Sequence, residues 1–89
     1  MSHNLASLAK RLSNARNVPS ANTIWQHYKG AQYHVTHIGI AEATEELQVC
    51  YFAVDEPLPY FWIRPLSEWL ETVEHESNTV SRFTFVKDA

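Results

Sequence analysis

Five histidines, one cysteine and ten acidic residues are the side chains of this 89-residue chain that could bind a metal ion or move a proton. His34 and His37 are three residues apart on an expected strand, so we expect their side chains to point to opposite faces. No second cysteine and no paired-histidine motif completes a tetrahedral zinc site. The sequence therefore predicts no metal site.

Catalysis by acid-base or nucleophilic groups is not indicated either. Glu68, Glu71 and Glu74 are close in sequence, but a general acid needs a carboxyl group in an apolar pocket with a pKa shifted away from that of its partner. Ser67 follows no nucleophile elbow, and Cys50 lies in an apolar segment where a packing role is usual. Two glycines are too few for a phosphate-binding loop. We expect no catalytic residue, no cofactor and no enzymatic activity.

Aromatic side chains are the remaining candidates for function. Small β-barrels often bind peptides through aromatic-lined grooves, in which rings give rigid contact area and a few polar groups fix orientation. The candidate binding residues are Tyr28, Tyr60, Trp62 and Arg64, with Phe61 beside them. The alternative is that Trp62 alternates into the core, and we favour this for Trp62 because small cores depend on their largest side chains. At least one of the pairs Tyr60/Trp62 and Phe61/Ile63 is expected to be buried.

The segment that must position these candidates runs from residue 60 to residue 71. Its first four residues are aromatic or β-branched, which favours a strand. Pro65 keeps Arg64 extended and suits the first position of a helix, so the strand is expected to end at Arg64. The next apolar residues recur at helical spacing and predict a turn that covers the core: Leu66, Trp69 and Leu70. An ion pair from Arg64 to Glu68 is expected across this turn.

Short apolar segments separated by turn residues make up the rest of residues 24–89. The expected strands are Trp25–Lys29, Gln32–Ile40, Leu47–Val54 and Val80–Val86, with extended chain near Val73. Apolar groups occupy both faces of the second strand, Tyr33 and Val35 on one face and Ile38 and Ile40 on the other. A bend at Gly39 would let both faces reach the core. These elements predict a small all-β barrel.

The N-terminal part has a different pattern. Leu5, Leu8, Ala9 and Leu12 recur at helical spacing, which predicts an amphipathic helix from Asn4 to about Arg16. A helix of about a dozen residues is marginal alone, so it is expected to dock on its own domain or on another subunit. A polar linker with Pro19 follows. We therefore divide the chain into a helix and linker, residues 1–23, and a barrel domain, residues 24–89.

Charge is divided unevenly between these two parts. Residues 1–23 hold three bases and no acid, whereas residues 24–89 hold four bases and ten acids, a net charge of −6. An acidic body repels a phosphate backbone. A nucleic-acid accessory domain is therefore the second hypothesis, with the helix bases Lys10, Arg11 and Arg16 binding phosphate and barrel aromatics stacking on bases. The single cysteine and the absence of a long apolar run favour a cytoplasmic protein without a membrane segment.

Several short motifs resemble one bacterial family, the domain-of-unknown-function family numbered 1653. They are His27-Tyr28-Lys29-Gly30, Tyr33, Trp62-Ile63-Arg64-Pro65-Leu66, Leu70-Glu71-Thr72-Val73 and Arg82-Phe83. The resemblance extends from Ile24 to Val86 and departs from the family pattern in the loop before Trp62 and in the turn from His75 to Thr79. It implies an SH3-like barrel and no assigned activity.

Together, these observations predict a mainly β protein. The expected fold is a small SH3-like barrel of about five strands with one short helical turn, preceded by an N-terminal α-helix. Our first hypothesis is a non-enzymatic module that binds a protein or peptide partner, with self-association through the N-terminal helix as one route.

Overall fold

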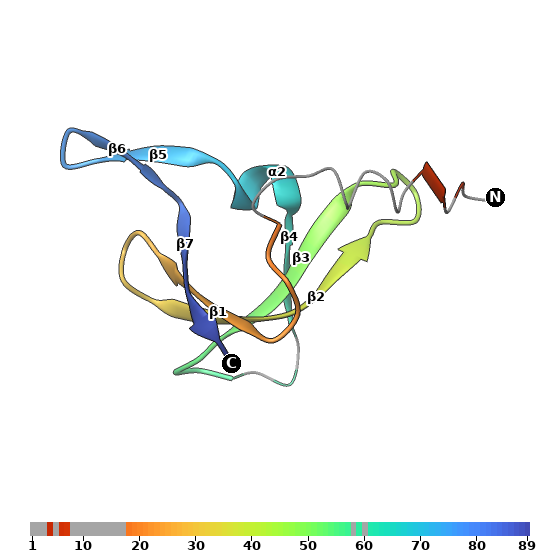
Figure 1. Ribbon diagram of the computed structural model, residues 1–89, viewed down its shortest axis with the longest axis horizontal. Helices are drawn as coiled ribbons and strands as arrows, with labels where there is room; N and C mark the ends of the chain where they lie inside the picture. The colour runs from red at the N-terminus through yellow and green to blue at the C-terminus, as the bar shows by residue number, and fades with distance from the viewer. Residues whose placement is uncertain (1–3, 5, 8–17, 58, 60) are drawn as a thin grey trace.

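The computed structural model describes residues 4, 6–7, 18–57, 59 and 61–89 (Figure 1). These residues form seven strands and one short helix. In chain order the elements are β1 Thr23–His27, β2 Gln32–Ile40, β3 Leu47–Ala53, β4 Trp62–Pro65, α2 Leu66–Trp69, β5 Thr72–His75, β6 Asn78–Ser81 and β7 Phe83–Asp88. The predicted strand Gln32–Ile40 is confirmed with its exact bounds, and β3 ends one residue earlier than predicted.

Two antiparallel sheets contain these strands. Five strands form one sheet in the order β4-β3-β2-β1-β7, and β5 and β6 form a second. Figure 1 shows the second sheet as an arm that projects from the curved first sheet. Because β4 and β7 are the two edges of the five-stranded sheet and do not pair with each other, this sheet is open.

The predicted fold class is therefore wrong in its details. The described chain has seven strands in two sheets, where one SH3-like barrel of about five strands was predicted. The elements of the described chain include no N-terminal helix, and only Ala6 and Ser7 of the predicted range have helical backbone among the described residues. The range predicted for that helix lies outside the described residues except for positions 4, 6 and 7, and the domain boundary at residue 24 stays a prediction.

The extra strands arise mainly at Arg82, which divides the segment predicted as one strand. Its N–H donates to the carbonyl oxygen of Glu71 at 3.0 Å, and its carbonyl oxygen accepts from the N–H of Tyr28 at 2.9 Å. These bonds use the backbone groups that a continuous ladder would need. A two-residue turn at Glu76 and Ser77, both with positive φ, closes the β5–β6 hairpin.

A β-bulge in β2 changes which residues face the core. The register shifts between Val35 and His37, and the hydroxyl of the intervening Thr36 donates to a backbone carbonyl of β3 at 3.1 Å. An extra residue restarts the alternation of side chains. Because their partners on β3 are two residues apart, Ile38 lies on the same face as Val35. The predicted opposite faces are therefore wrong, and the change of face occurs at Thr36, three residues before Gly39, where it was predicted.

The same bulge affects the histidines of β2. His34 pairs with Phe52 and His37 with Cys50, and these partners are two residues apart on β3. His34 and His37 therefore share a face, contrary to the prediction. No group of three His, Cys, Asp or Glu side chains that could hold a metal ion is found in the part of the chain that the structure describes.

Aromatic packing around Trp69 forms the centre of the core. The indole stacks on Phe83 with ring centroids 3.7 Å apart and an angle of 5° between the planes. Trp69 is 1% exposed, so the prediction that it covers the core is confirmed, whereas Leu70 is 40% exposed. The buried apolar residues are Ile24, Val35, Leu47, Val49, Tyr51, Leu66, Trp69 and Phe83. No helix among the described residues is long and apolar enough to span a bilayer.

Candidate functional site: a basic and aromatic cluster

Two of the predicted binding residues, Tyr28 and Arg64, meet around His27. We name this group of side chains the basic–aromatic cluster; it consists of His27, Tyr28, Lys29, Arg64, Arg82 and Phe83. It draws on three parts of the chain: the end of β1 with the turn after it, β4, and the β6–β7 junction. Pairing of β1 with β7 brings the first and last of these together, since His27 lies opposite Phe83.

The turn after β1 places a tyrosine ring and a lysine beside His27. The N–H of Gly30 donates to the carbonyl oxygen of His27 at 2.8 Å, and the N–H of Lys29 donates to Nδ1 of His27 at 3.2 Å. Gly30 has a φ of 112°, which favours glycine. The rings of His27 and Tyr28 have centroids 4.5 Å apart, and Nζ of Lys29 lies 5.7 Å from the centroid of Tyr28.

Arg64 reaches the cluster from the edge strand β4. Its Nε donates to the hydroxyl of Tyr51 at 3.3 Å, and its guanidinium carbon lies 5.6 Å from the ring centroid of Phe83, within the range of a cation–π contact. Its Nη1 lies 3.8 Å from Oε1 of Glu68, which confirms the predicted ion pair. Pro65 belongs to β4 and α2 begins at Leu66, one residue later than predicted.

Arg82 supplies the second guanidinium. Its Nη2 donates to Oε2 of Glu71 at 3.0 Å. Its Nε is buried and has no hydrogen-bond partner within the described part of the chain. A buried donor without an acceptor costs free energy, on the order of 1–3 kcal/mol. Glu71, which pairs with the Nη2 of Arg82, therefore leaves the buried Nε without a partner.

Burial and the positive charges of the cluster change the pKa of His27. Partial burial, and then the positive charges of Arg64, Arg82 and Lys29, lower the pKa of His27 from its ordinary value of 6.5. Nδ1 accepts a hydrogen bond from a backbone N–H, which places the ring proton of the neutral form on Nε2. Residues 24–89 contain four bases, and three of them act on this one histidine. Three of the four bases of residues 24–89 thus gather at His27, and Glu68 and Glu71 pair with two of them.

The lowered pKa of His27 predicts a pH dependence of stability. The unfolded chain binds the proton near the ordinary pKa of 6.5, before the folded chain does, so the free energy of unfolding should fall as the pH drops from neutral through about 6. His27→Gln should weaken this pH dependence. His37→Gln, on an exposed position, is the matched control and should keep it. Denaturant unfolding at a series of pH values measures both, and identical slopes in all three proteins would contradict the assignment.

The other two predicted binding residues, Trp62 and Tyr60, are not members of the cluster. Trp62 is 53% exposed, so its predicted burial is wrong. Phe61 and Ile63 are 55% and 62% exposed, so neither alternating set of the described residues enters the core. The reason is that β4 is an edge strand, and Trp69 of α2 fills the core instead. Tyr60 lies outside the described residues.

Sequence reasoning missed four members of the cluster: His27, Lys29, Arg82 and Phe83. All four occur in the motifs that carry the family resemblance, but no spacing rule joins residues that are more than fifty positions apart. The scarcity of bases could have indicated Lys29 and Arg82, because residues 24–89 contain only four bases.

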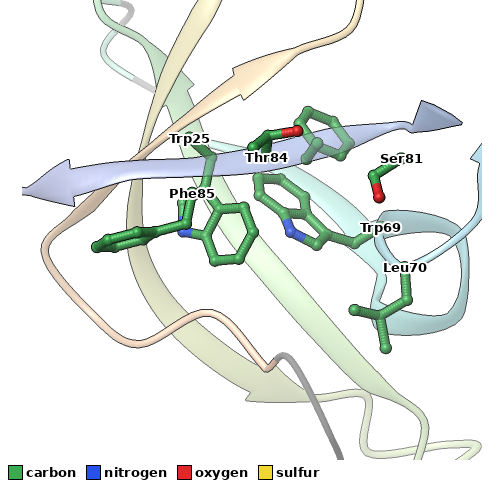
Figure 2. A pocket seen from close by; sticks show the side chains of 7 residues that line it. Trp25, Trp69, Leu70, Ser81, Thr84 and Phe85 are labelled. Atoms are coloured by element: carbon green, nitrogen blue, oxygen red, sulfur yellow. The ribbon is translucent and has the colours of Figure 1, made fainter.

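A hollow of about 280 Å³ lies beside Trp69 and is lined in part by Phe83 of the cluster (Figure 2). Figure 2 shows Trp25 and Phe85 along one side of it, Leu70 and Ser81 along the other, and Trp69 between them. Nε1 of Trp69 is buried and finds no hydrogen-bond partner among the described residues. The hollow contains no charged side chain and none of the predicted binding residues.

Comparison with known proteins identifies the family. A family described as "Protein of unknown function (DUF1653)" matches residues 23–85. The chain belongs to this family. The crystal structure of a DUF1653 protein from Bordetella bronchiseptica is similar to it, with a TM-score of 0.71 and 25% sequence identity, over 83% of this chain and 94% of that one. No curated protein matches the sequence.

All six residues of the basic–aromatic cluster lie within the range that matches the DUF1653 family. The cluster is thus part of the family domain and not of the N-terminal segment. The resemblance predicted from the motifs is confirmed, and the family description assigns no activity.

Proposed function

We propose that this DUF1653 protein is a non-enzymatic interaction module that binds acidic peptide segments of a partner protein at the basic–aromatic cluster. The observation that carries the proposal is the convergence of three of the four bases of residues 24–89 on His27, in a domain with a net charge of −6. Three bases against the two paired carboxylates of Glu68 and Glu71 leave one excess positive charge there, which attracts acidic partners.

The chemistry of the cluster suits carboxylates next to apolar groups. Guanidinium groups bind carboxylates through charge-assisted hydrogen bonds, and Arg64 and Arg82 are both only partly buried. The exposed ring of Trp62 and the half-buried ring of Tyr28 add rigid contact area. Arg64 has only a loose ion pair at 3.8 Å with a half-exposed Glu68, so a ligand carboxylate can replace that partner at small cost.

Replacement of single lysines tests the proposal with matched variants. Lys29 belongs to the cluster, whereas Lys87 lies on β7 away from it, and both are exposed. Lys29→Gln should weaken binding of a fluorescein-labelled acidic peptide about two- to fivefold, corresponding to roughly 1 kcal/mol or less for an exposed charge. Lys87→Gln carries the same change in net charge and should leave the affinity close to that of the wild type.

The peptide itself supplies the second control. Replacing each Glu of the probe by Gln should abolish most of the binding measured by fluorescence anisotropy. Added salt should weaken binding of the acidic form. Equal losses in the two lysine variants, or equal affinity for the Gln peptide, would show that the cluster does not recognise carboxylates.

Nucleic-acid binding is the second candidate, because basic groups beside exposed rings also suit single-stranded nucleic acid. The helix bases that this hypothesis used, Lys10, Arg11 and Arg16, lie outside the described residues, so its support within the described residues is the same three bases as for the peptide. A labelled single-stranded oligonucleotide measured at two salt concentrations tests it. Absence of binding at low salt would remove this candidate.

A further inference from the structure

The outer edge of β4 is an unusual surface. No strand of the described chain pairs with this edge. Three large exposed apolar side chains lie along it: Phe61, directly before β4, and Trp62 and Ile63, the first two residues of β4. Proteins usually protect such an edge with charges, bulges or a covering loop. Exposed apolar edge strands are therefore surfaces where extended peptides add to a sheet.

Pro65 shows which backbone groups of β4 face outward. It pairs with Gln48 of β3, and since proline has no N–H it cannot take part in a hydrogen-bonded pair there. Positions that bond to the neighbouring strand alternate with positions that face away in an antiparallel ladder. Trp62 and Arg64 are therefore bonded to β3, and the N–H and C=O of Ile63 point to the open edge.

Side chains of β4 alternate in the same way between two surfaces. Arg64 reaches the basic–aromatic cluster, and Trp62, two residues before it, lies on the same face opposite Tyr51. Ile63 lies on the other face, opposite Cys50, where it lines a shallow hollow of about 140 Å³. A strand added beside β4 would place its own side chains alternately on these two surfaces.

We propose that an extended peptide with alternating acidic and apolar residues adds to the sheet as a strand along β4. Its backbone exchanges hydrogen bonds with the N–H and C=O of Ile63. The residue opposite Ile63 is apolar, and its two neighbours carry carboxylates on the face of Arg64. This inference rests on the proposed function and specifies the conformation and sequence pattern of the partner.

A peptide fits this edge better than a second copy of the chain. The strand has four residues, and a stable dimer interface needs roughly 1,000 Å² or more of buried surface. Pairing two β4 edges would also bring two basic–aromatic clusters close together, and like charges across an interface are unfavourable. An acidic peptide of a few residues has the complementary charge and the matching length.

Amide exchange in the isotope-labelled full-length chain tests the inference directly. The probe is acetyl-Glu-Val-Glu-Val-Glu-amide. On binding, exchange of the Ile63 amide hydrogen should slow, because it gains a partner, while the amides of β7, the other edge strand, should not change. The Arg64 amide bonds to β3 and should be protected with or without peptide.

Two altered probes separate strand addition from charge attraction. Methylating both valine nitrogens removes backbone donors without changing charge, and should weaken binding about tenfold, as expected for lost hydrogen bonds. Acetyl-Glu-Glu-Val-Val-Glu-amide keeps the composition but not the alternation, and should also bind more weakly. Equal affinity of all three peptides would overturn the inference.

The outcomes distinguish this inference from the proposed function. Binding that shifts the Lys29 amide but leaves the Ile63 amide unchanged would support the acidic-peptide function and overturn strand addition. Absence of binding by every acidic probe would overturn both. Protection of the Ile63 amide without peptide, together with a dimer in solution, would show that a second copy occupies the edge and would overturn the peptide proposal.

Discussion

Replacing Trp69 with alanine is expected to lower the free energy of unfolding by about 3–5 kcal/mol, the usual cost of truncating a buried tryptophan. The side chain is 1% exposed and stacks on Phe83. It also meets Trp25 and Tyr51 edge to face, with ring centroids 5.8 Å and 5.2 Å away. A domain of this size has on the order of 5 kcal/mol to lose. We therefore expect Trp69→Ala to be largely unfolded at room temperature.

Two neighbouring substitutions are the matched controls for Trp69→Ala. Ser67 and Glu68 lie on the exposed side of α2, so Ser67→Ala should change stability by less than about 0.5 kcal/mol. Glu68→Ala loses a half-exposed ion pair and should cost roughly 1 kcal/mol or less. Thermal unfolding followed by circular dichroism compares the three variants. A Trp69→Ala protein with the melting temperature of the wild type would contradict the central position of Trp69.

Local patterns predicted β2, β3 and α2 closely, whereas they merged β6 and β7 into one strand. The bounds of β2 follow from its β-branched and aromatic residues, and the position of α2 follows from Pro65 and the spacing of Leu66 and Trp69. These features depend on neighbours in sequence. Backbone preference and side-chain periodicity are sufficient to predict them.

Features that depend on distant partners were not predictable in this way. The bulge at Thr36 leaves no mark in the residue types of β2, yet it decides that Ile38 shares the face of Val35. The identity of the edge strands depends on which strands pair. Trp62 was predicted to be buried from its residue type, but it is 53% exposed because the strand order makes β4 an edge strand.

Only two of the six residues of the basic–aromatic cluster were predicted, for the same reason. Tyr28 and Arg64 were singled out by residue type, and both belong to it. His27 and Arg82 join them only because β1 pairs with β7, and because the backbone of Arg82 bonds to that of Tyr28. A single sequence indicates which segments are strands, but not which distant strands pair.

Replacing Trp62 with alanine is expected to lower the affinity for peptide and to leave stability nearly unchanged, whereas replacing Trp69 lowers stability. The side chain of Trp62 is 53% exposed, so stability should change by less than about 0.5 kcal/mol. Affinity for the acidic peptide should fall about thirtyfold, corresponding to roughly 2 kcal/mol, because exposed tryptophans at binding surfaces are frequent hot spots. Unfolding experiments and fluorescence anisotropy on the same protein preparation measure the two quantities.

Phe61→Ala is the matched control for Trp62→Ala, because Phe61 is 55% exposed and contacts Phe52, away from the cluster. It removes a similar amount of exposed aromatic surface and should weaken peptide binding less. If exposed rings bound the peptide nonspecifically, both variants would instead lose the same amount of peptide affinity. A folded Trp62→Ala protein with unchanged affinity would exclude Trp62 from the peptide site and restrict that site to the side of the cluster formed by His27, Tyr28 and Arg82.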